Sequence, residues 1–321
     1  MTSPIIDLPQ APPDPGALLS WDVPPLPVLP VAAIVMAGLY CWGVYRVRRT
    51  GRAWSQWRTA SFLAGCLALA AVTGLQIERY GYGVFSIFMF QHLTLSMAVP
   101  PLLVVGSPGR LLLRTTAHHG AGRVVLVAAL WGLRGRAGRL ALHPGVTIPV
   151  FLFSYYGLYL SSLFDALAST VFGHTSIEVF FLLSGLVFIV PVLAVGPLPI
   201  RQSYLGRLFD LFVEMPLHVF FGVILMMSTT PMLATFASPP SAWGLDPVAD
   251  QNLAGALAWS YGEPVALLVV VIFCIAWHKH ETLRFAPSST RSDDDSAYLA
   301  YNTYLHSLAT GERRVLSLIH I

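Results

Sequence analysis

The feature of this sequence that most restricts its fold is a series of seven long apolar stretches, each nearly free of charged residues. They cover residues 28–45, 59–77, 85–105, 146–164, 176–195, 209–230 and 254–277. A helix needs about 20 mostly apolar residues to cross the roughly 30 Å hydrocarbon core of a bilayer, and each stretch is long enough to do so. We therefore predict an all-α, polytopic membrane protein with seven transmembrane helices.

The composition excludes several other classes of protein. Only 11% of the residues are charged and the mean hydropathy is +0.65, whereas a soluble domain carries about 25% charged residues. A soluble enzyme is therefore excluded. The net charge of +3 comes without a basic cluster interleaved with aromatic residues, which argues against nucleic-acid binding. The three cysteines show no paired spacing, so we predict no disulfide framework.

The distribution of Lys and Arg predicts the orientation. Of the 19 such residues, all except Arg79 fall after the first, third and fifth apolar stretches or near the C-terminal tail. Cytoplasmic loops of membrane proteins carry the excess of positive charge. We therefore expect the N-terminus outside the cell and the C-terminus in the cytoplasm.

The segments outside the apolar stretches have different compositions. Residues 1–25 are rich in proline and lack the features of a signal peptide, so we interpret them as a disordered external arm. Residues 122–140 have a short apolar centre flanked by arginines, which is typical of an interfacial helix. Residues 279–321 are expected to form a cytoplasmic tail with a short helix over 293–310. Residues 316–321 resemble a translated sequencing adapter.

Ionisable residues at membrane depth cost roughly 2.5–3.5 kcal/mol each on insertion scales and are candidate functional residues. Within or at the edges of the apolar stretches these are His92, Glu178, Asp210, Glu214, His218 and Glu263.

Two of the histidines share a pattern. Met89 precedes His92 by three residues, and Met215 precedes His218 by the same interval, which places each pair on one helical face. Thioether and imidazole ligands together suit Cu(I). We therefore predict transient Cu(I) binding by these four residues. The alternative stays open, because methionine also fills gaps in apolar cores and a neutral histidine can simply bond a neighbouring helix.

Further residues on the same or adjacent helices are candidate supports for this metal site. They are Glu214, Glu263, Met226 and Met227. Glu263 directly precedes Pro264, which frees a backbone carbonyl one turn earlier, so the carboxylate is either a cation ligand or a packing contact.

The polar residues are expected to lie at different depths in the membrane. At 1.5 Å per residue, His92 and His218 differ in depth by roughly 7–8 Å, which favours successive stations over one rigid site. We interpret Glu178 and the nearby His174 as a pair at the outer rim. Asp250 is expected to cap the N-terminus of the last helix.

Several short motifs follow one another in order between Trp21 and about Ala309. They include Trp21-Asp22-Val23-Pro24-Pro25-Leu26, Pro100-Pro101-Leu102-Leu103, Phe181-Leu182-Leu183-Ser184-Gly185, Met215-Pro216-Leu217-His218-Val219-Phe220-Phe221-Gly222-Val223 and Trp243-Gly244-Leu245. This order resembles the CtaG-type cytochrome c oxidase assembly proteins, most closely their actinobacterial branch.

The resemblance implies a multi-pass factor of the bacterial plasma membrane that helps copper reach a haem–copper terminal oxidase. Its expected partners are oxidase subunits or other copper chaperones, and catalysis is not implied. No motif of a nucleophile elbow, a phosphate-binding loop or a zinc protease is present. The copper-resistance-type domain that precedes this module in some relatives is not expected here.

The same resemblance implies that His92 with Met89, and His218 with Met215, are functional residues. The chain departs from the family pattern at two positions, because it has Phe88 and Glu178 where the family tends to have histidines. Both departures favour a loose Met/His transfer path, or a metal-free scaffold for oxidase subunits. A copper permease and a b-type cytochrome with two histidine ligands are further alternatives.

Overall fold

The computed structural model describes residues 8–116, 120–194, 203–285 and 303. Within these ranges every regular element is a helix, and the one extended contact is an isolated β-bridge between Trp21 and Leu75. The all-α prediction is therefore confirmed for the described residues. The chain divides into two compact units, 1–271 and 272–321.

Five helices are long. They are α2 (Val28–Arg49), α3 (Gln56–Gly74), α12 (Val171–Leu193), α13 (Tyr204–Met227) and α14 (Pro247–Phe285), the last of which continues into the second unit. The shorter helices are α1 (Pro15–Leu18), α4 (Ile77–Gly81), α5 (Phe85–Leu93), α6 (Val99–Val105), α7 (Pro108–Thr115), α8 (Gly120–Arg134), α9 (Arg136–Ala141), α10 (Pro144–Leu152) and α11 (Leu163–Ala168). Two π-helical turns, η1 (Thr94–Ala98) and η2 (Phe153–Gly157), follow α5 and α10, and two 3₁₀ turns are η3 (Ala234–Phe236) and η4 (Ser241–Trp243).

Among the described residues, four helical stretches are long and apolar enough to cross a membrane. They are α2, the stretch Phe85–Thr115 formed by α5 to α7, α12, and Gly206–Met227 of α13. These four helices indicate a membrane protein. The other three expected spans fall on α3, on α10 with η2, and on α14, and the seven-span topology stays a prediction.

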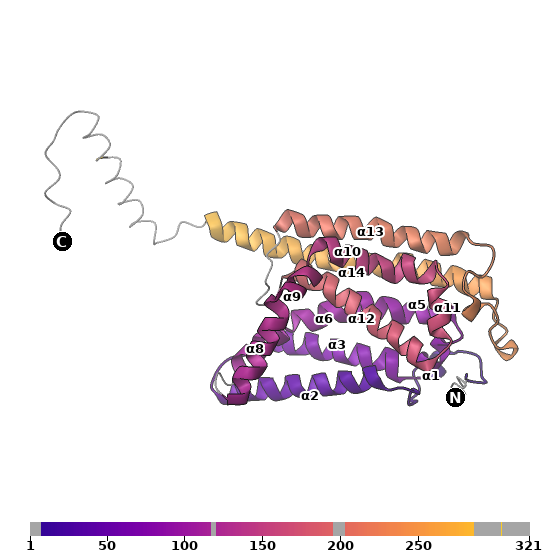
Figure 1. Ribbon diagram of the computed structural model, residues 1–321, viewed down its shortest axis with the longest axis horizontal. Coiled ribbons are helices and arrows are strands. Elements are labelled where there is room, and N and C mark those ends of the chain that lie inside the picture. Colours follow the sequence, from indigo (N-terminus) through magenta and orange to yellow (C-terminus); the bar gives the residue numbers. More distant parts are fainter. Residues whose placement is uncertain (1–7, 117–119, 195–202, 286–302, 304–321) are drawn as a thin grey trace. The chain divides into compact units, whose positions relative to one another are not determined.

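The stretch Phe85–Thr115 lies at the centre of the bundle. In its most apolar part 72% of the residues are buried, against 28% for α2. Figure 1 shows α2 and α3 side by side, and α12 packs against α6 and η1. The last contact is close because Gly185 has no side chain: a Cβ at this position would lie 2.0 Å from the carbonyl oxygen of Ser96. Small residues allow helix backbones to approach in this way.

Residues 8–25 are not a disordered arm, contrary to the expectation for residues 1–25. The indole of Trp243 donates a hydrogen bond to the carbonyl of Pro9 at 3.0 Å, and the hydroxyl of Tyr80 donates to the carbonyl of Ala11 at 3.1 Å. Leu8 and Leu18 pack against the cluster formed by Tyr80, Val84 and Trp243. This packing lets the prolines, whose φ is already fixed, order at low entropic cost. Residues 8–25, which include α1, lie with α4 at one end of the bundle. We call this end the α4 end.

Asp250 also differs from its expected role. Its carboxylate accepts hydrogen bonds from the backbone N–H groups of Phe85 at 2.6 Å and Ser86 at 3.2 Å, so it caps the start of α5. The start of its own helix, α14, is capped by Asp246, which accepts from the N–H groups of Val248 and Ala249. Asp250 therefore ties α14 to the central stretch, instead of ending its own helix.

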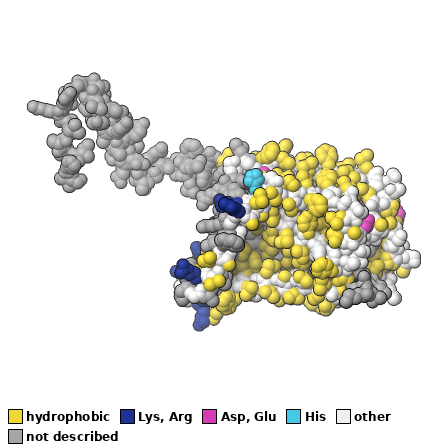
Figure 2. All heavy atoms as spheres, viewed as in Figure 1, with side chains coloured by type: hydrophobic (Ala, Val, Ile, Leu, Met, Phe, Trp, Pro, Cys, Tyr) yellow, Lys and Arg dark blue, Asp and Glu magenta, His cyan; other side chains and the backbone are white. Residues whose placement is uncertain are grey.

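The expected interfacial helix over 122–140 is two helices, α8 and α9. They are separated at Gly135, whose backbone is extended (φ −63°, ψ 171°). The predicted tail helix over 293–310 lies outside the described residues, apart from Thr303. Figure 2 shows a face with apolar side chains over its middle, and its visible Lys and Arg side chains gather near the end that carries α8.

Candidate functional site

A pocket of about 580 Å³ opens between α13 and α14. Five of its lining residues come from α13 and five from α14. They are Glu214, Met215, Pro216, His218, Val219, Ser260, Gly262, Glu263, Pro264 and Leu267. Figure 1 shows the two helices running alongside each other. The pocket therefore contains four of the residues that the sequence proposed as ligands or supports.

Glycines determine how closely α13 and α14 approach. A Cβ at Gly222 would lie 2.6 Å from the carbonyl oxygen of Gly255, and a Cβ at Gly255 would lie 2.7 Å from that of Gly222. Gly262 faces the imidazole of His218, since a Cβ there would lie 2.2 Å from its Cε1 atom. The absence of three side chains thus brings the helices together and leaves the room that the His218 ring occupies.

Two polar atoms beside the pocket are buried without hydrogen-bond partners among the described residues. They are Nε2 of His218 and Oε1 of Glu214. A buried polar group without a partner costs about 1–3 kcal/mol, and such groups in native proteins call for an explanation. Both atoms have lone pairs that a cation can use.

The remaining predicted residues of α13 and α14 divide into two groups. Met215 is half-buried and lines the pocket. Glu263 is exposed and accepts a hydrogen bond from the indole of Trp259 at 2.9 Å. Met226 and Met227 do not line the pocket: Met226 packs at Gly255, and Met227 is 77% exposed. The expected support from these two methionines is therefore absent from the pocket wall.

His92 is fully buried on α5, outside the pocket lining. Its ring stacks on Phe181 of α12 with centroids 3.6 Å apart, and its Nδ1 lies 3.0 Å from the hydroxyl oxygen of Tyr159. Its Nε2 has no hydrogen-bond partner among the described residues. Met89 is fully buried in the apolar core and does not line the pocket either.

Tyr155 connects the two histidines. Its ring centroid lies 4.5 Å from that of His92 and 5.3 Å from that of His218. The Tyr155 hydroxyl lies 3.3 Å from the hydroxyl of Ser96, which donates to the carbonyl of His92 at 2.8 Å. The arrangement therefore offers two separate imidazoles with one aromatic neighbour in common, the first enclosed and the second beside an open pocket.

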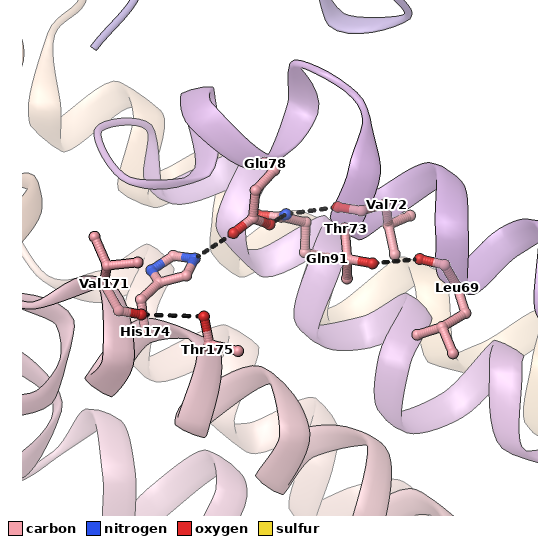
Figure 3. Close-up of polar contacts among 8 residues, drawn as sticks. All are labelled: Leu69, Val72, Thr73, Glu78, Gln91, Val171, His174 and Thr175. Atoms are coloured by element: carbon pink, nitrogen blue, oxygen red, sulfur yellow. Dashed lines mark hydrogen bonds and ion pairs between the residues drawn. The ribbon is translucent and has the colours of Figure 1, made fainter. Parts of the chain in front are cut away.

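A second polar cluster lies at the α4 end. Figure 3 shows His174 of α12 directed at Glu78 of α4, with Gln91 of α5 beside them. Glu178, one turn after His174, belongs to the same group. We call Glu78, His174 and Glu178 the α4-end cluster. The prediction from the sequence paired Glu178 with His174 but did not include Glu78. The sequence feature that could have indicated Glu78 is its charge, because it is a carboxylate in the aromatic and glycine-rich segment that follows α3.

Comparison with known proteins identifies relatives over nearly the whole chain. A model of the family described as cytochrome c oxidase caa3 assembly factor matches residues 38–280. The uncharacterized protein Mb0105 of Mycobacterium bovis is 33% identical over 96% of the chain and 47% of its own length. The uncharacterized protein ML1998 of Mycobacterium leprae is 35% identical over 88% of the chain and 44% of its own length. The chain thus spans about half the length of these relatives. No solved structure matches it.

Proposed function

Because the chain belongs to the cytochrome c oxidase caa3 assembly factor family, we propose that it is a non-catalytic assembly factor of the plasma membrane that passes copper to a haem–copper terminal oxidase. Copper is the cargo of this reaction, held transiently as Cu(I) and released to a partner. The partners are oxidase subunits or copper chaperones.

The observation that carries this proposal is the pocket between α13 and α14. Its lining includes Met215, His218 and Glu214 from α13 and Glu263 from α14, and so combines a thioether, an imidazole and two carboxylates. Soft thioether and imidazole ligands select Cu(I). The carboxylates offset the charge of a cation at a depth where water is scarce. Few ligands and an open mouth favour fast release over tight retention.

The position of Glu263 supports a partner at the pocket mouth. Its carboxylate is exposed, and so is the neighbouring Leu267, which is 62% exposed. Glu263 lies within the expected seventh span, where lipid would leave a carboxylate poorly solvated. A polar helix of another membrane protein would cover this carboxylate and the pocket together. The donor and the recipient of copper would then share one interface.

The proposal includes seven spans with the N-terminus outside. Basic residues support this orientation, because Arg46, Arg48 and Arg49 end α2 and Arg110 and Arg114 lie on α7. The α4 end carries Arg79, which is paired with Asp22. Under the positive-inside rule the arginine-rich end faces the cytoplasm.

The first test is complementation of a deletion strain. Variants His218→Ala and His92→Ala, singly and together, are compared with wild type for terminal-oxidase activity and for copper content of the oxidase. We expect the double variant to lose most of the activity and added copper to restore it. The matched control is His143→Ala, since this exposed histidine caps α10 outside the pocket. Immunoblots of the membranes check that each variant is present.

Full complementation by the double variant would contradict copper transfer through these histidines and leave a metal-free scaffold. Loss of activity that copper does not restore would also favour a scaffold. Copper uptake by proteoliposomes that contain only this protein would instead indicate a permease. A Soret band in the purified protein would indicate a b-type cytochrome.

The second test concerns the partner surface. A photo-crosslinking amino acid is placed at Leu267, beside the pocket mouth, or at Leu39 on α2, which is also 62% exposed. We expect a crosslink to an oxidase subunit or a copper chaperone from position 267 but not from position 39. Equal crosslinking from both positions would contradict a specific interface at the pocket.

A further inference from the structure

We propose that Glu78, His174 and Glu178 form a binding site for one divalent transition-metal ion, separate from the pocket between α13 and α14. The proposal concerns the α4-end cluster alone and does not depend on the role of the protein in oxidase assembly.

The donor atoms are close enough for one ion. One ligand atom from each of the three residues lies within 4.8 Å of the other two. The Nε2 atom of His174 lies 3.5 Å from Oε1 of Glu78. In a tetrahedral zinc site with bonds of about 2.0–2.1 Å, ligand atoms are about 3.4 Å apart. The histidine and Glu78 already have this separation, and Glu178 requires at most a small movement.

The cluster is buried and incompletely paired. The three residues are each at most 3% exposed. Oε1 of Glu178 has no hydrogen-bond partner among the described residues. Two carboxylates in an apolar interior repel each other and lose their hydration, so they need a proton or a cation between them. An ion of charge +2 balances the pair with a neutral imidazole as third ligand.

Neighbouring residues hold the ligands in place. The amide of Gln91 donates hydrogen bonds to Oε2 of Glu78 at 2.8 Å and to the carbonyl of Val72 at 2.7 Å. The ring of Tyr82 stacks on that of His174 with centroids 3.8 Å apart. In known metal sites such outer partners fix the orientation of the ligands. Figure 3 shows Gln91 between Glu78 and the backbone of Val72.

The ligand types determine which metal fits. Two carboxylates and one imidazole are hard to borderline ligands, and the cluster contains no sulfur. Such a set suits Zn²⁺ and Cu²⁺, with Cu²⁺ bound more tightly in the usual order of divalent ions, and it does not select Cu(I). The α4-end cluster and the pocket therefore differ in the oxidation state of copper that they prefer.

Zinc binding to the purified full chain tests the proposal. Zn²⁺ is added to metal-free protein in detergent, and bound metal is measured by competition with a chromophoric chelator. We expect one tight Zn²⁺ per chain in the wild type. Glu178→Gln and His174→Gln are expected to weaken this binding about 100-fold or more, since even loss of an outer partner costs 10–100-fold.

The matched control is Asp165→Asn, which neutralises a carboxyl outside both the α4-end cluster and the pocket between α13 and α14. A rise in the thermal unfolding temperature on adding Zn²⁺, in the wild type and the control but not in the two cluster variants, gives a second readout. It also shows that each variant is folded. Wild-type protein that binds no Zn²⁺ at micromolar concentration, or cluster variants that bind as tightly as wild type, would overturn the proposal.

Cu²⁺ gives a spectroscopic test of the same site. We expect the electron paramagnetic resonance spectrum of the Cu²⁺-loaded protein to show coupling to one imidazole nitrogen. The coupling should disappear in His174→Gln and persist in His92→Gln. Persistence in His174→Gln would assign the nitrogen to another histidine and contradict this site.

Discussion

The α4-end cluster and the pocket between α13 and α14 place similar numbers of donor atoms in very different surroundings. The α4-end cluster is enclosed, and its ligands are held by Gln91 and Tyr82. Both regions contain buried donor atoms that have no hydrogen-bond partner among the described residues, but the pocket opens at the surface beside the exposed carboxylate of Glu263. Oriented, enclosed ligands favour retention of a metal, whereas donors beside an open pocket favour exchange. One chain can therefore combine a retained ion with a transferred one.

The largest effect that would distinguish the two regions is expected from Gly262→Ala. The added methyl group would lie 2.2 Å from the His218 ring, which must turn away, although no ligand is changed. We expect Cu(I) affinity, measured by competition with bicinchoninic acid, to fall at least about 100-fold, as for the loss of a ligand. Zn²⁺ binding at the α4 end should be unchanged. Loss of both would mean that the substitution disturbs the whole bundle.

The next effect is a pH dependence of stability that arises at the α4 end. Burial raises the pKa of Glu78, which lies on α4 outside the expected spans, from 4.5 to about 7. Its raised pKa favours the folded state below pH 4.5, and this stability is lost as the pH rises through 7. The facing ionisable groups are His174, Glu178 and Tyr82.

We therefore expect metal-free protein to unfold at a lower temperature at pH 8 than at pH 5, with a contribution from Glu78 of about 2 kcal/mol. Thermal unfolding in the presence of a chelator measures it. Glu78→Gln should remove this part of the dependence, and Glu263→Gln, which changes an exposed carboxyl of the pocket, serves as the control. An unchanged pH dependence in Glu78→Gln would contradict the assignment.

Gly81→Ala should have a moderate effect on the α4-end cluster. The methyl group would lie 2.0 Å from Oε1 of Gln91 and displace the amide that holds Glu78. Because Gln91 is a positioning residue and not a ligand, we expect Zn²⁺ affinity to fall about tenfold. Cu(I) affinity should be unaffected. A decrease as large as that of Glu178→Gln would instead indicate that Gln91 itself contributes a ligand atom.

The smallest effect is expected from Trp259→Phe, which removes the hydrogen bond to Glu263 at the pocket mouth. The net contribution of a hydrogen bond to stability is about 0.5–1.5 kcal/mol, and the bond between Trp259 and Glu263 is exposed. We expect Cu(I) affinity to change about twofold to fivefold, measured as for Gly262→Ala. A change near 100-fold would mean that this indole positions Glu263 as an essential ligand.

The sequence predicted the part of the site that depends on one helix. The three-residue spacing placed Met215 and His218 on one face of α13, and both line the pocket. The same spacing at Met89 and His92 predicted an equivalent site, but Met89 is packed in the core. Spacing within one helix does not reveal which face meets a cavity, because the neighbouring helix decides it.

The parts that the sequence missed depend on contacts between distant segments. Glu78 meets His174 and Glu178 only because the fold brings together α4 and α12, which are far apart in the sequence. Residues 8–25 looked disordered because they are rich in proline, and their order comes from contacts with Tyr80 and Trp243. No local pattern contains this information.

The contact between Gly222 and Gly255 also limits how this sequence can evolve. Each glycine faces the backbone of the other helix, so a substitution at one cannot be offset by a smaller residue at the second. Ligand residues, in contrast, can be exchanged whenever the cargo or the partner changes. In a saturation library selected only for protein level in the membrane, we expect the two glycines to tolerate fewer substitutions than Met215 or His218. Descendants that lost the metal would therefore still retain both glycines.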